Sequence, residues 1–80
     1  MGAVLTNISN FKAFTGLTVV RLRENSLTTT SVNNILIDLD DNGLLNGECR
    51  LTGGSSSAPT GDGLIAQDNL LSKGWVANTN

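Results

Sequence analysis

Two groups of side chains in this 80-residue sequence could do chemistry, and the first is a set of oxygen ligands. Asp38, Asp40 and Asn42 alternate with other residues, and Gly43 follows them. Calcium loops of the EF-hand type place oxygen ligands at positions 1, 3, 5 and 12 and a glycine at position 6. The twelfth position falls on Cys49, however, where the loop needs a glutamate that supplies two oxygens. We therefore favour a helix-ending turn and no metal site, with a weak calcium site as the alternative.

The second group is a row of arginines in two predicted strands. The triplet Val20–Leu22 is repeated by Cys49–Leu51, 29 residues further along, so that both triplets place an arginine at the centre. Alternate residues of a strand point to opposite faces, so the arginines face away from the core. Two like charges side by side stabilise nothing by themselves. The row is either a solvated face balanced by Glu24 and Glu48, or a surface that binds a partner; its candidate binding residues are Arg21, Arg23, Arg50 and Thr52.

Composition argues against several function classes. The sequence has no histidine and no tyrosine, so it lacks the commonest general base and metal ligand. Its one cysteine, Cys49, occupies an inward strand position, which indicates a small buried residue rather than a nucleophile. We predict no catalytic residues, no enzymatic activity and no cofactor. A net charge of −2 disfavours nucleic-acid binding, and no run of about 20 apolar residues is present to span a membrane.

Two helices are predicted between the strands. The first runs from Thr30 or Ser31, either of which could cap it, to Asp40, and its apolar residues at helical spacing are Val32, Ile35, Leu36 and Leu39. The second runs over 62–72, with Thr60 and Asp62 as candidate caps and a buried face made by Leu64, Ala66, Leu70 and Leu71. A third strand follows, in which Trp75 is expected beside Cys49 and is interpreted as closing the end of the core.

The first strand lies in a recognisable repeat pattern. Leu17, Val20, Leu22, Asn25 and Leu27 have the spacing L-x-x-L-x-L-x-x-N-x-L, in which Val20 and Leu22 point inward together. The stretch 5–28 resembles one turn of an internalin-like leucine-rich repeat. This resemblance implies that the amide of Asn25 bonds to backbone groups of the neighbouring coil.

The second half of the chain is similar to a different group of repeat proteins. Its strings N-N-I-L-x-D-L, S-A-P-T-G-x-G-L and L-x-x-K-G-W resemble the closing segment of repeat proteins from tailed-phage virions and related bacterial surface proteins. The ending Gly74–Asn80 resembles the last stretch of such tail-fibre or surface proteins. The resemblance implies a place on a virion, with a bacterial cell surface as the alternative.

These observations predict one α/β domain over 1–80: a short leucine-rich-repeat solenoid of about three coils, with parallel strands on one side and helices on the other. We expect a non-enzymatic structural or binding module of a phage virion, of the tail-fibre, tail or capsid-decoration type. The alternative is an adhesin or a receptor- or glycan-binding tip on a bacterial cell. Expected partners are other virion or surface protein chains, or an acidic glycan. A chain this small is expected to self-associate or dock on a larger assembly, through apolar residues near its start (Val4, Ile8, Phe11 and Phe14).

Overall fold

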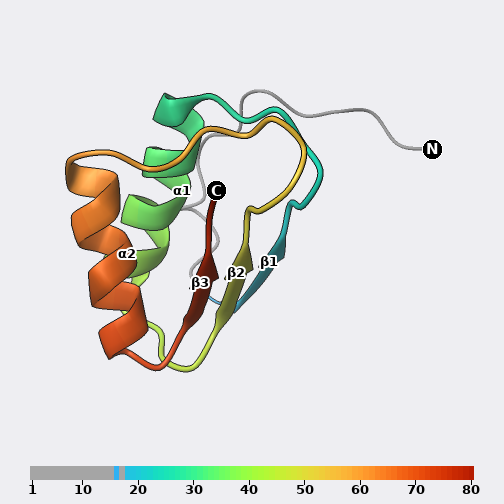
Figure 1. Ribbon diagram of the computed structural model, residues 1–80. Helices are drawn as coiled ribbons and strands as arrows, with labels where there is room; N and C mark the ends of the chain where they lie inside the picture. Colours follow the sequence, from blue (N-terminus) through green and yellow to red (C-terminus); the bar gives the residue numbers. More distant parts are fainter. Residues whose placement is uncertain (1–15, 17) are drawn as a thin grey trace.

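Three short parallel strands form one layer of the molecule and two helices form the other (Figure 1). The computed structural model describes residue 16 and residues 18–80. In chain order the elements are β1 (Val19–Arg21), α1 (Thr29–Asn42), β2 (Glu48–Arg50), α2 (Asp62–Ser72) and β3 (Val76–Asn78). The sheet order is β1-β2-β3, and both pairings are parallel. The predicted α/β class, with parallel strands opposite helices, is confirmed.

The strand register confirms one predicted repeat and corrects the other. Val20 pairs with Cys49 as the 29-residue repeat predicts, but Cys49 then pairs with Ala77 and not with Trp75. Trp75 lies before β3, where its indole ring packs over Gly47. A Cβ atom at position 47 would lie 2.5 Å from that ring, so only glycine leaves room for it. The indole Nε1 donates to the Leu44 carbonyl over 2.8 Å, and this bond holds the ring in the turn.

Helix α1 begins and ends at polar turns close to the predicted positions. The N-cap is Thr28, whose hydroxyl accepts from the Ser31 backbone N–H at 3.2 Å, so the prediction of Thr30 or Ser31 as the cap was wrong. The helix continues through Asn42 and closes at Gly43, which has a left-handed φ of 74° and donates to the Asp40 carbonyl. Its predicted apolar residues, Val32, Ile35, Leu36 and Leu39, are all buried.

Helix α2 has the predicted bounds, but its caps differ from the prediction and only part of its predicted buried face is buried. Its N-cap is Gly61, which has no side chain to donate or accept a capping bond. Thr60, one of the predicted caps, instead exchanges hydrogen bonds with the Asn33 side chain on α1. Ala66 and Leu70 are buried as expected. Leu64 and Leu71 are 48% and 51% exposed, since they lie on the side of α2 that no described element covers.

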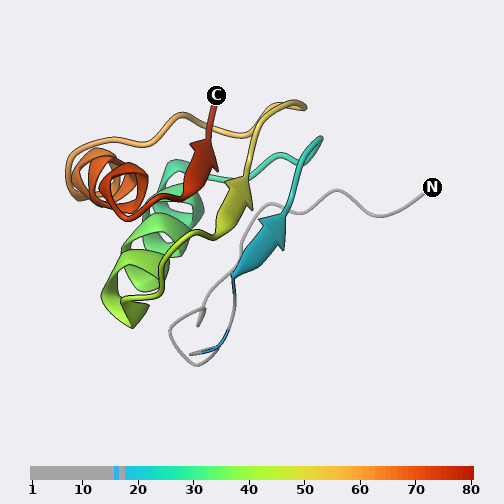
Figure 2. The same ribbon diagram turned by 90° about the horizontal axis from the view of Figure 1, so that it is seen from below.

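The two strand–helix units, β1 with α1 and β2 with α2, lie one on the other and share one core (Figure 2). The loops after β1 and β2 run side by side: the Ser55 N–H donates to the Asn25 carbonyl, and the Ser56 hydroxyl accepts from the Leu27 N–H. The core residues are Val20, Leu27, Val32, Ile35, Leu36, Leu39, Cys49, Leu51, Ala66, Leu70, Trp75 and Ala77. Leu22, which the repeat spacing predicts to point inward, packs against this core but is only partly buried.

The Nδ2 group of Asn25 bonds within its own chain segment. Its Nδ2 donates to the Leu22 carbonyl at 2.8 Å and to the Arg23 carbonyl at 3.2 Å. Both bonds stay within the first unit, whereas the resemblance implies bonds to the neighbouring coil. Contact with the second unit is made by the Asn25 backbone carbonyl, which accepts from Ser55.

Several predictions fall on residues that the structure does not describe. Leu17 and the apolar residues Val4, Ile8, Phe11 and Phe14 lie outside the described residues. Among the residues that are described, no helix is both long enough and apolar enough to cross a bilayer.

Candidate binding surface on the strands

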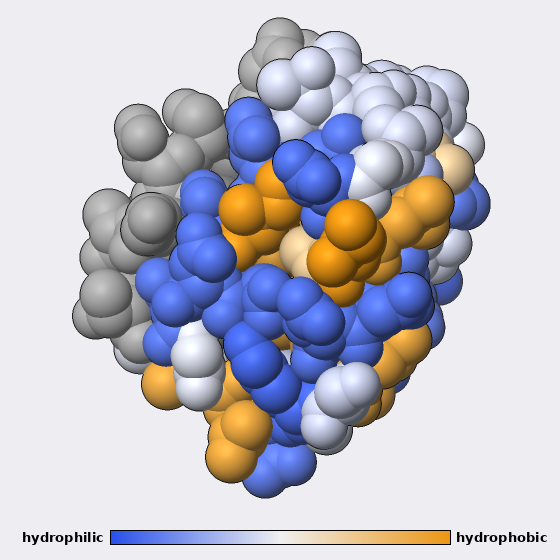
Figure 3. Space-filling model, turned by 90° about the vertical axis from the view of Figure 1, so that its left-hand side faces the viewer, coloured by the Kyte–Doolittle hydropathy of each residue, from blue (hydrophilic) through white to orange (hydrophobic). Residues whose placement is uncertain are grey.

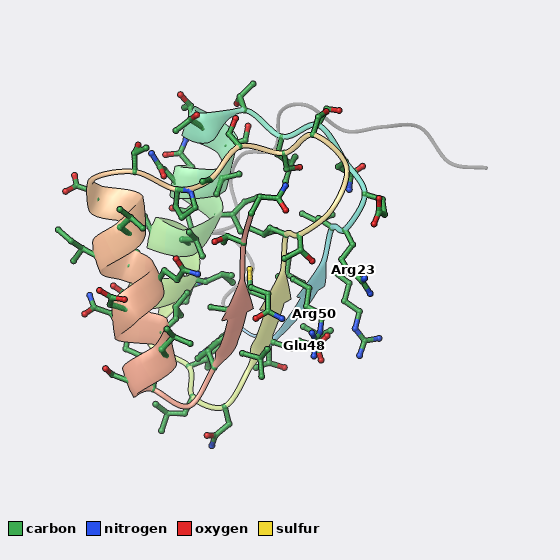
Figure 4. All side chains as sticks on the ribbon, in the orientation of Figure 1. Arg23, Glu48 and Arg50 are labelled. Atoms are coloured by element: carbon green, nitrogen blue, oxygen red, sulfur yellow. The ribbon has the colours of Figure 1, made fainter. Side chains whose placement is uncertain are left out.

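The sheet turns one side toward the helices and the other toward solvent. In β1 and β3 the central residue is buried and its two neighbours are exposed; in β2 the neighbours are half-buried. We call the outward side the strand face; its residues are Val19, Arg21, Arg23, Glu48, Arg50, Thr52, Val76 and Asn78. All four predicted binding residues belong to it, and Figure 4 shows Arg23 and Arg50 on the side of the sheet away from the helices.

Glu48 joins the two central arginines. Its Oε2 accepts from Arg21 Nε at 2.8 Å and from Arg50 Nε at 2.7 Å, and its Oε1 accepts a longer 3.4 Å bond from Arg21 Nη2. Arg21 and Arg50 are direct partners in the register of β1 and β2, so this carboxylate relieves their repulsion. The predicted balancing role of Glu48 is confirmed.

Glu24 does not share this role, which corrects the second half of that prediction. It has a left-handed φ of 60°, and its Oε2 accepts from the Gly54 backbone N–H at 3.1 Å. The chain turns away from the strand at this position, so the Glu24 carboxylate bonds to the loop after β2 and leaves the arginines to Glu48.

The paired charges keep each other ionised. Hydrogen bonds from Arg21 and Arg50 lower the pKa of Glu48 to about 2. The hydrogen bond and charge of Glu48 in turn raise the pKa of Arg21. At neutral pH three arginines therefore share the strand face with one carboxylate, and the face carries a net charge of +2 on a chain whose net charge is −2.

Arg23 and Thr52 lie beside each other just past the ends of β1 and β2. Two backbone hydrogen bonds lie on either side of this pair. The Leu22 N–H donates to the Arg50 carbonyl, and the Glu24 N–H donates to the Thr52 carbonyl. Arg23 is exposed and makes no ion pair with any described residue. The Arg21 side chain is 67% exposed despite its bond to Glu48. Both guanidinium groups thus present N–H donors to solvent, in the fork geometry that suits carboxylates.

The candidate calcium segment lies within a helix. Asp38, Asp40 and Asn42 are all part of α1, and the predicted helix-ending turn follows at Gly43. Asp40 accepts from Lys73 Nζ and, at 3.0 Å, from Asn69 Nδ2. Burial is the largest single influence on the pKa of Asp40 and raises it, but these two hydrogen bonds and the charge of Lys73 together lower the pKa below its ordinary value. Over residue 16 and residues 18–80, no group of three His, Cys, Asp or Glu residues is placed to hold a metal ion.

Cys49 and Trp75 take the inward positions expected of them. Cys49 is fully buried, and this burial raises the pKa of its thiol to about 12, so the thiol stays protonated at neutral pH. Trp75 is 3% exposed, although its place in the register differs from the prediction.

Sequence reasoning missed one polar residue at the end of the sheet. Gln67 Nε2 donates to the Ala77 carbonyl at 2.9 Å and to Thr79 Oγ1 at 3.2 Å. The sequence did contain a signal for this residue. Gln67 follows the buried Ala66 in α2 just as Leu36 follows the buried Ile35 in α1. A polar residue therefore stands where the equivalent position of the first helix is apolar.

Comparisons with protein families, with curated proteins and with solved structures give no match to this chain.

Proposed function

We propose that this chain is a non-enzymatic binding module of the leucine-rich-repeat type, which docks an acidic partner on its strand face. The observation that carries the proposal is the pair Arg21 and Arg50, which share the single carboxylate of Glu48 on adjacent parallel strands. The exposed Arg23 lies just past the end of β1 and adds a third guanidinium group beside them. Guanidinium groups held on a sheet lose little freedom when they bind carboxylates, so such a row suits an acidic protein surface.

The distribution of charge supports the same surface. All five aspartates of the sequence lie on the two helices, and Lys73 at the end of α2 pairs with one of them. Three of the five basic residues lie on the strand face. An acidic partner is therefore attracted to the strands and repelled by the helices, which orients it on approach.

The architecture in this proposal is a short solenoid of about three coils. Its support is the leucine-rich-repeat spacing around β1, together with two strand–helix units that share a core and the third parallel strand β3. Repeat proteins of this kind commonly bind partners on the strand side.

The proposed place of action is a phage virion, as a tail-fibre, tail or capsid-decoration protein that docks on other virion chains. Its support is the resemblance of the segment around 33–80 to closing segments of virion and bacterial surface proteins. Mass spectrometry of purified particles, released from cells that carry the gene, tests it: the chain should copurify with particles. Its recovery from the cell envelope alone would contradict the virion and favour a bacterial surface adhesin.

Binding to an acidic polymer tests the strand face. Poly-glutamate titrated calorimetrically should bind the wild-type protein, and Arg21→Ala with Arg50→Ala should weaken binding by about ten-fold, since exposed charge contacts are individually modest. The control is Thr30→Glu with Ile65→Glu, which changes the net charge equally at exposed helix positions. Equal losses in the two double variants would show that net charge alone governs binding and would reject the strand face.

A further inference from the structure

At three places in the sequence an asparagine or aspartate is followed by a glycine: Asn42–Gly43, Asn46–Gly47 and Asp62–Gly63. Such pairs can react without an enzyme. The backbone nitrogen of the glycine attacks the side-chain carbonyl carbon of the residue before it, and glycine has no side chain to hinder the approach. A hydrogen bond from the glycine N–H restrains that nitrogen. The bond made by each glycine therefore indicates which pair can react in the folded protein.

Two of the three pairs are restrained by the helices. The Gly43 N–H donates to the Asp40 carbonyl at 3.1 Å. The Gly63 N–H donates to the Thr60 carbonyl at 2.9 Å. Solvent reaches both segments, since Gly43 and Asp62 are exposed and the helix side of the molecule is largely hydrophilic (Figure 3). Hydrogen bonding therefore restrains these two pairs where burial does not.

The pair Asn46–Gly47 lies in the turn between α1 and β2 and differs in this respect. Asn46 is exposed and has a left-handed φ of 61°, which asparagine adopts more readily than most residues. Its backbone N–H donates to the Lys73 carbonyl at 3.0 Å, and the Gly47 carbonyl accepts from the Val76 N–H at 2.9 Å. No described residue accepts from the Gly47 N–H. The turn is thus fixed on both sides of a nitrogen that no described residue restrains.

We propose that Asn46 is a site of spontaneous deamidation, and that the product displaces the start of β2. In the first step the Gly47 nitrogen forms a bond to Cγ of Asn46, and the Cγ–Nδ2 bond breaks. Ammonia leaves with the proton that the Gly47 nitrogen gives up, and a cyclic succinimide remains. Water then opens this ring at either carbonyl, which gives aspartate or isoaspartate at position 46. Water is the only co-reactant.

Isoaspartate lengthens the backbone where the structure leaves no room for a shift. In this product the chain runs through the former side chain, so an additional carbon separates positions 46 and 47. Gly47 is buried beneath the Trp75 ring, and an added Cβ at Gly47 would lie 2.5 Å from that ring. The Asn46 side chain is also close to Gly74, where an added Cβ would lie 2.3 Å from Asn46 Oδ1. A longer turn must therefore move against its neighbours.

The same turn leads directly to the strand face. Figure 1 shows the turns before β2 and β3 together at one end of the molecule. Glu48 begins β2 immediately after Gly47, and its carboxylate accepts from Arg21 and Arg50. The Glu48 N–H also donates to the Thr18 carbonyl at 2.7 Å. Deamidation therefore changes the geometry of the strand face as the protein ages, whether or not that face binds an acidic partner.

Mass spectrometry of the folded full chain, incubated at mildly alkaline pH, tests the site. Fragmentation that separates the two asparagines should show deamidation at Asn46 about ten-fold or more faster than at Asn42, because the end of α1 must open before Asn42 can react. Incubation in urea is the reference: both pairs are Asn-Gly, so their rates should become similar once the chain is unfolded. Equal rates in the folded protein, or a faster reaction at Asn42, would overturn the proposal. An Asn46 that stays unmodified in the folded protein after both pairs have reacted in urea would also overturn it.

Two variants and the single tryptophan test the effect on β2. Asn46→Gly removes the reacting amide at a position whose positive φ suits glycine, so the protein should stay folded and lose the reaction at this turn. The matched control, Asn42→Gln, should react at Asn46 as the wild-type protein does. Fluorescence of Trp75, the only tryptophan, should change in the isolated isoaspartate form and stay constant in Asn46→Gly aged alongside. Identical emission from the fresh and isoaspartate forms would reject the displacement of β2.

Discussion

At the scale of single residues, Glu48 determines what the strand face can do. It accepts bonds from Arg21 and Arg50 within 3 Å, and so allows two arginines to stand side by side in the register. Because it neutralises only one of them, and Arg23 adds a third positive charge, a net positive surface remains. Exposed ion pairs contribute little to stability, so the importance of Glu48 lies in the geometry and charge of the face.

The titration of Glu48 provides a direct check of this bridge. We expect carboxyl-carbon NMR to give a pKa of about 2 in the wild-type protein, and a higher value in Arg21→Ala, because a hydrogen bond to the charged form is lost. The folded pKa is below the ordinary 4.5, so the contribution of Glu48 to stability is present above pH 4.5 and is lost as pH falls toward 2. An unchanged pKa in Arg21→Ala would contradict the bridge.

The inward and outward sides of the strands predict unequal costs of substitution. Leu51→Ala should lower the free energy of unfolding by about 2–5 kcal/mol, since Leu51 is fully buried. Arg21→Ala should change it by no more than about 0.5 kcal/mol, as for most surface positions. Leu22→Ala should cost less than Leu51→Ala, because Leu22 is only partly buried. Urea denaturation measures all three, and a larger loss in Arg21→Ala than in Leu51→Ala would reverse the assignment of faces.

At the scale of elements, close contact between the two units depends on glycine. Gly54 has a φ of 57° and lies against the first unit, where an added Cβ would come within 2.3 Å of the Asn25 carbonyl oxygen. Gly61 has a similar φ of 47° but has open space around it. The two positions therefore share a positive φ, which L residues rarely adopt, and differ in whether a neighbour blocks a side chain.

This difference predicts the behaviour of two alanine variants. Gly61→Ala should lower the free energy of unfolding by about 1–3 kcal/mol, because its φ of 47° and ψ of −119° lie in a region that side chains rarely adopt. Gly54→Ala should cost about 1–3 kcal/mol more, because it also forces the two loops apart. Thermal and urea denaturation of both variants give the comparison. Equal losses would show that the loops are not packed as closely as the structure places them.

The sequence predicts these elements well where periodicity and turns act locally. The bounds of α2, the buried face of α1 and the pairing of Val20 with Cys49 all follow from spacing. The register of β3 does not follow from spacing. Trp75 lies in the turn before β3, where its ring packs over Gly47 and its Nε1 donates to the Leu44 carbonyl, and a repeat pattern predicts neither contact. The exposure of Leu64 and Leu71 was missed because helical spacing identifies apolar positions but not whether a neighbour covers them.

The candidate site was predictable to a similar degree. Strand alternation places Arg21 and Arg50 outward, beside the buried Val20 and Cys49. Arg23 and Thr52 follow just past the two strands, where backbone bonds continue the pairing. Glu24 and Glu48 have different partners because the chain turns away after β1. Glu24 adopts a positive φ at this turn, and glutamate is not a residue type that predicts one. Long-range bonds such as Gln67 to Ala77 require the packed structure.

At the scale of the whole molecule, the chain has a positive strand side and a negative helix side. This separation predicts that acidic partners bind more weakly as salt increases, since exposed charges are screened beyond about 8 Å at physiological ionic strength. Poly-glutamate binding measured from about 0.05 to 0.5 M salt should fall steadily. Binding that is insensitive to salt would contradict an electrostatic surface and favour apolar recognition.

The most direct test of the strand face is a map of where an acidic ligand binds. Poly-glutamate added to the ¹⁵N-labelled protein should shift the amide signals of residues 19–23 and 48–52, and leave those of the outer sides of α1 and α2 unchanged. The same titration with Arg21→Ala and Arg50→Ala should give weak shifts or none, with an otherwise intact spectrum. Shifts centred on the helices, or equal shifts in the double variant, would contradict the account.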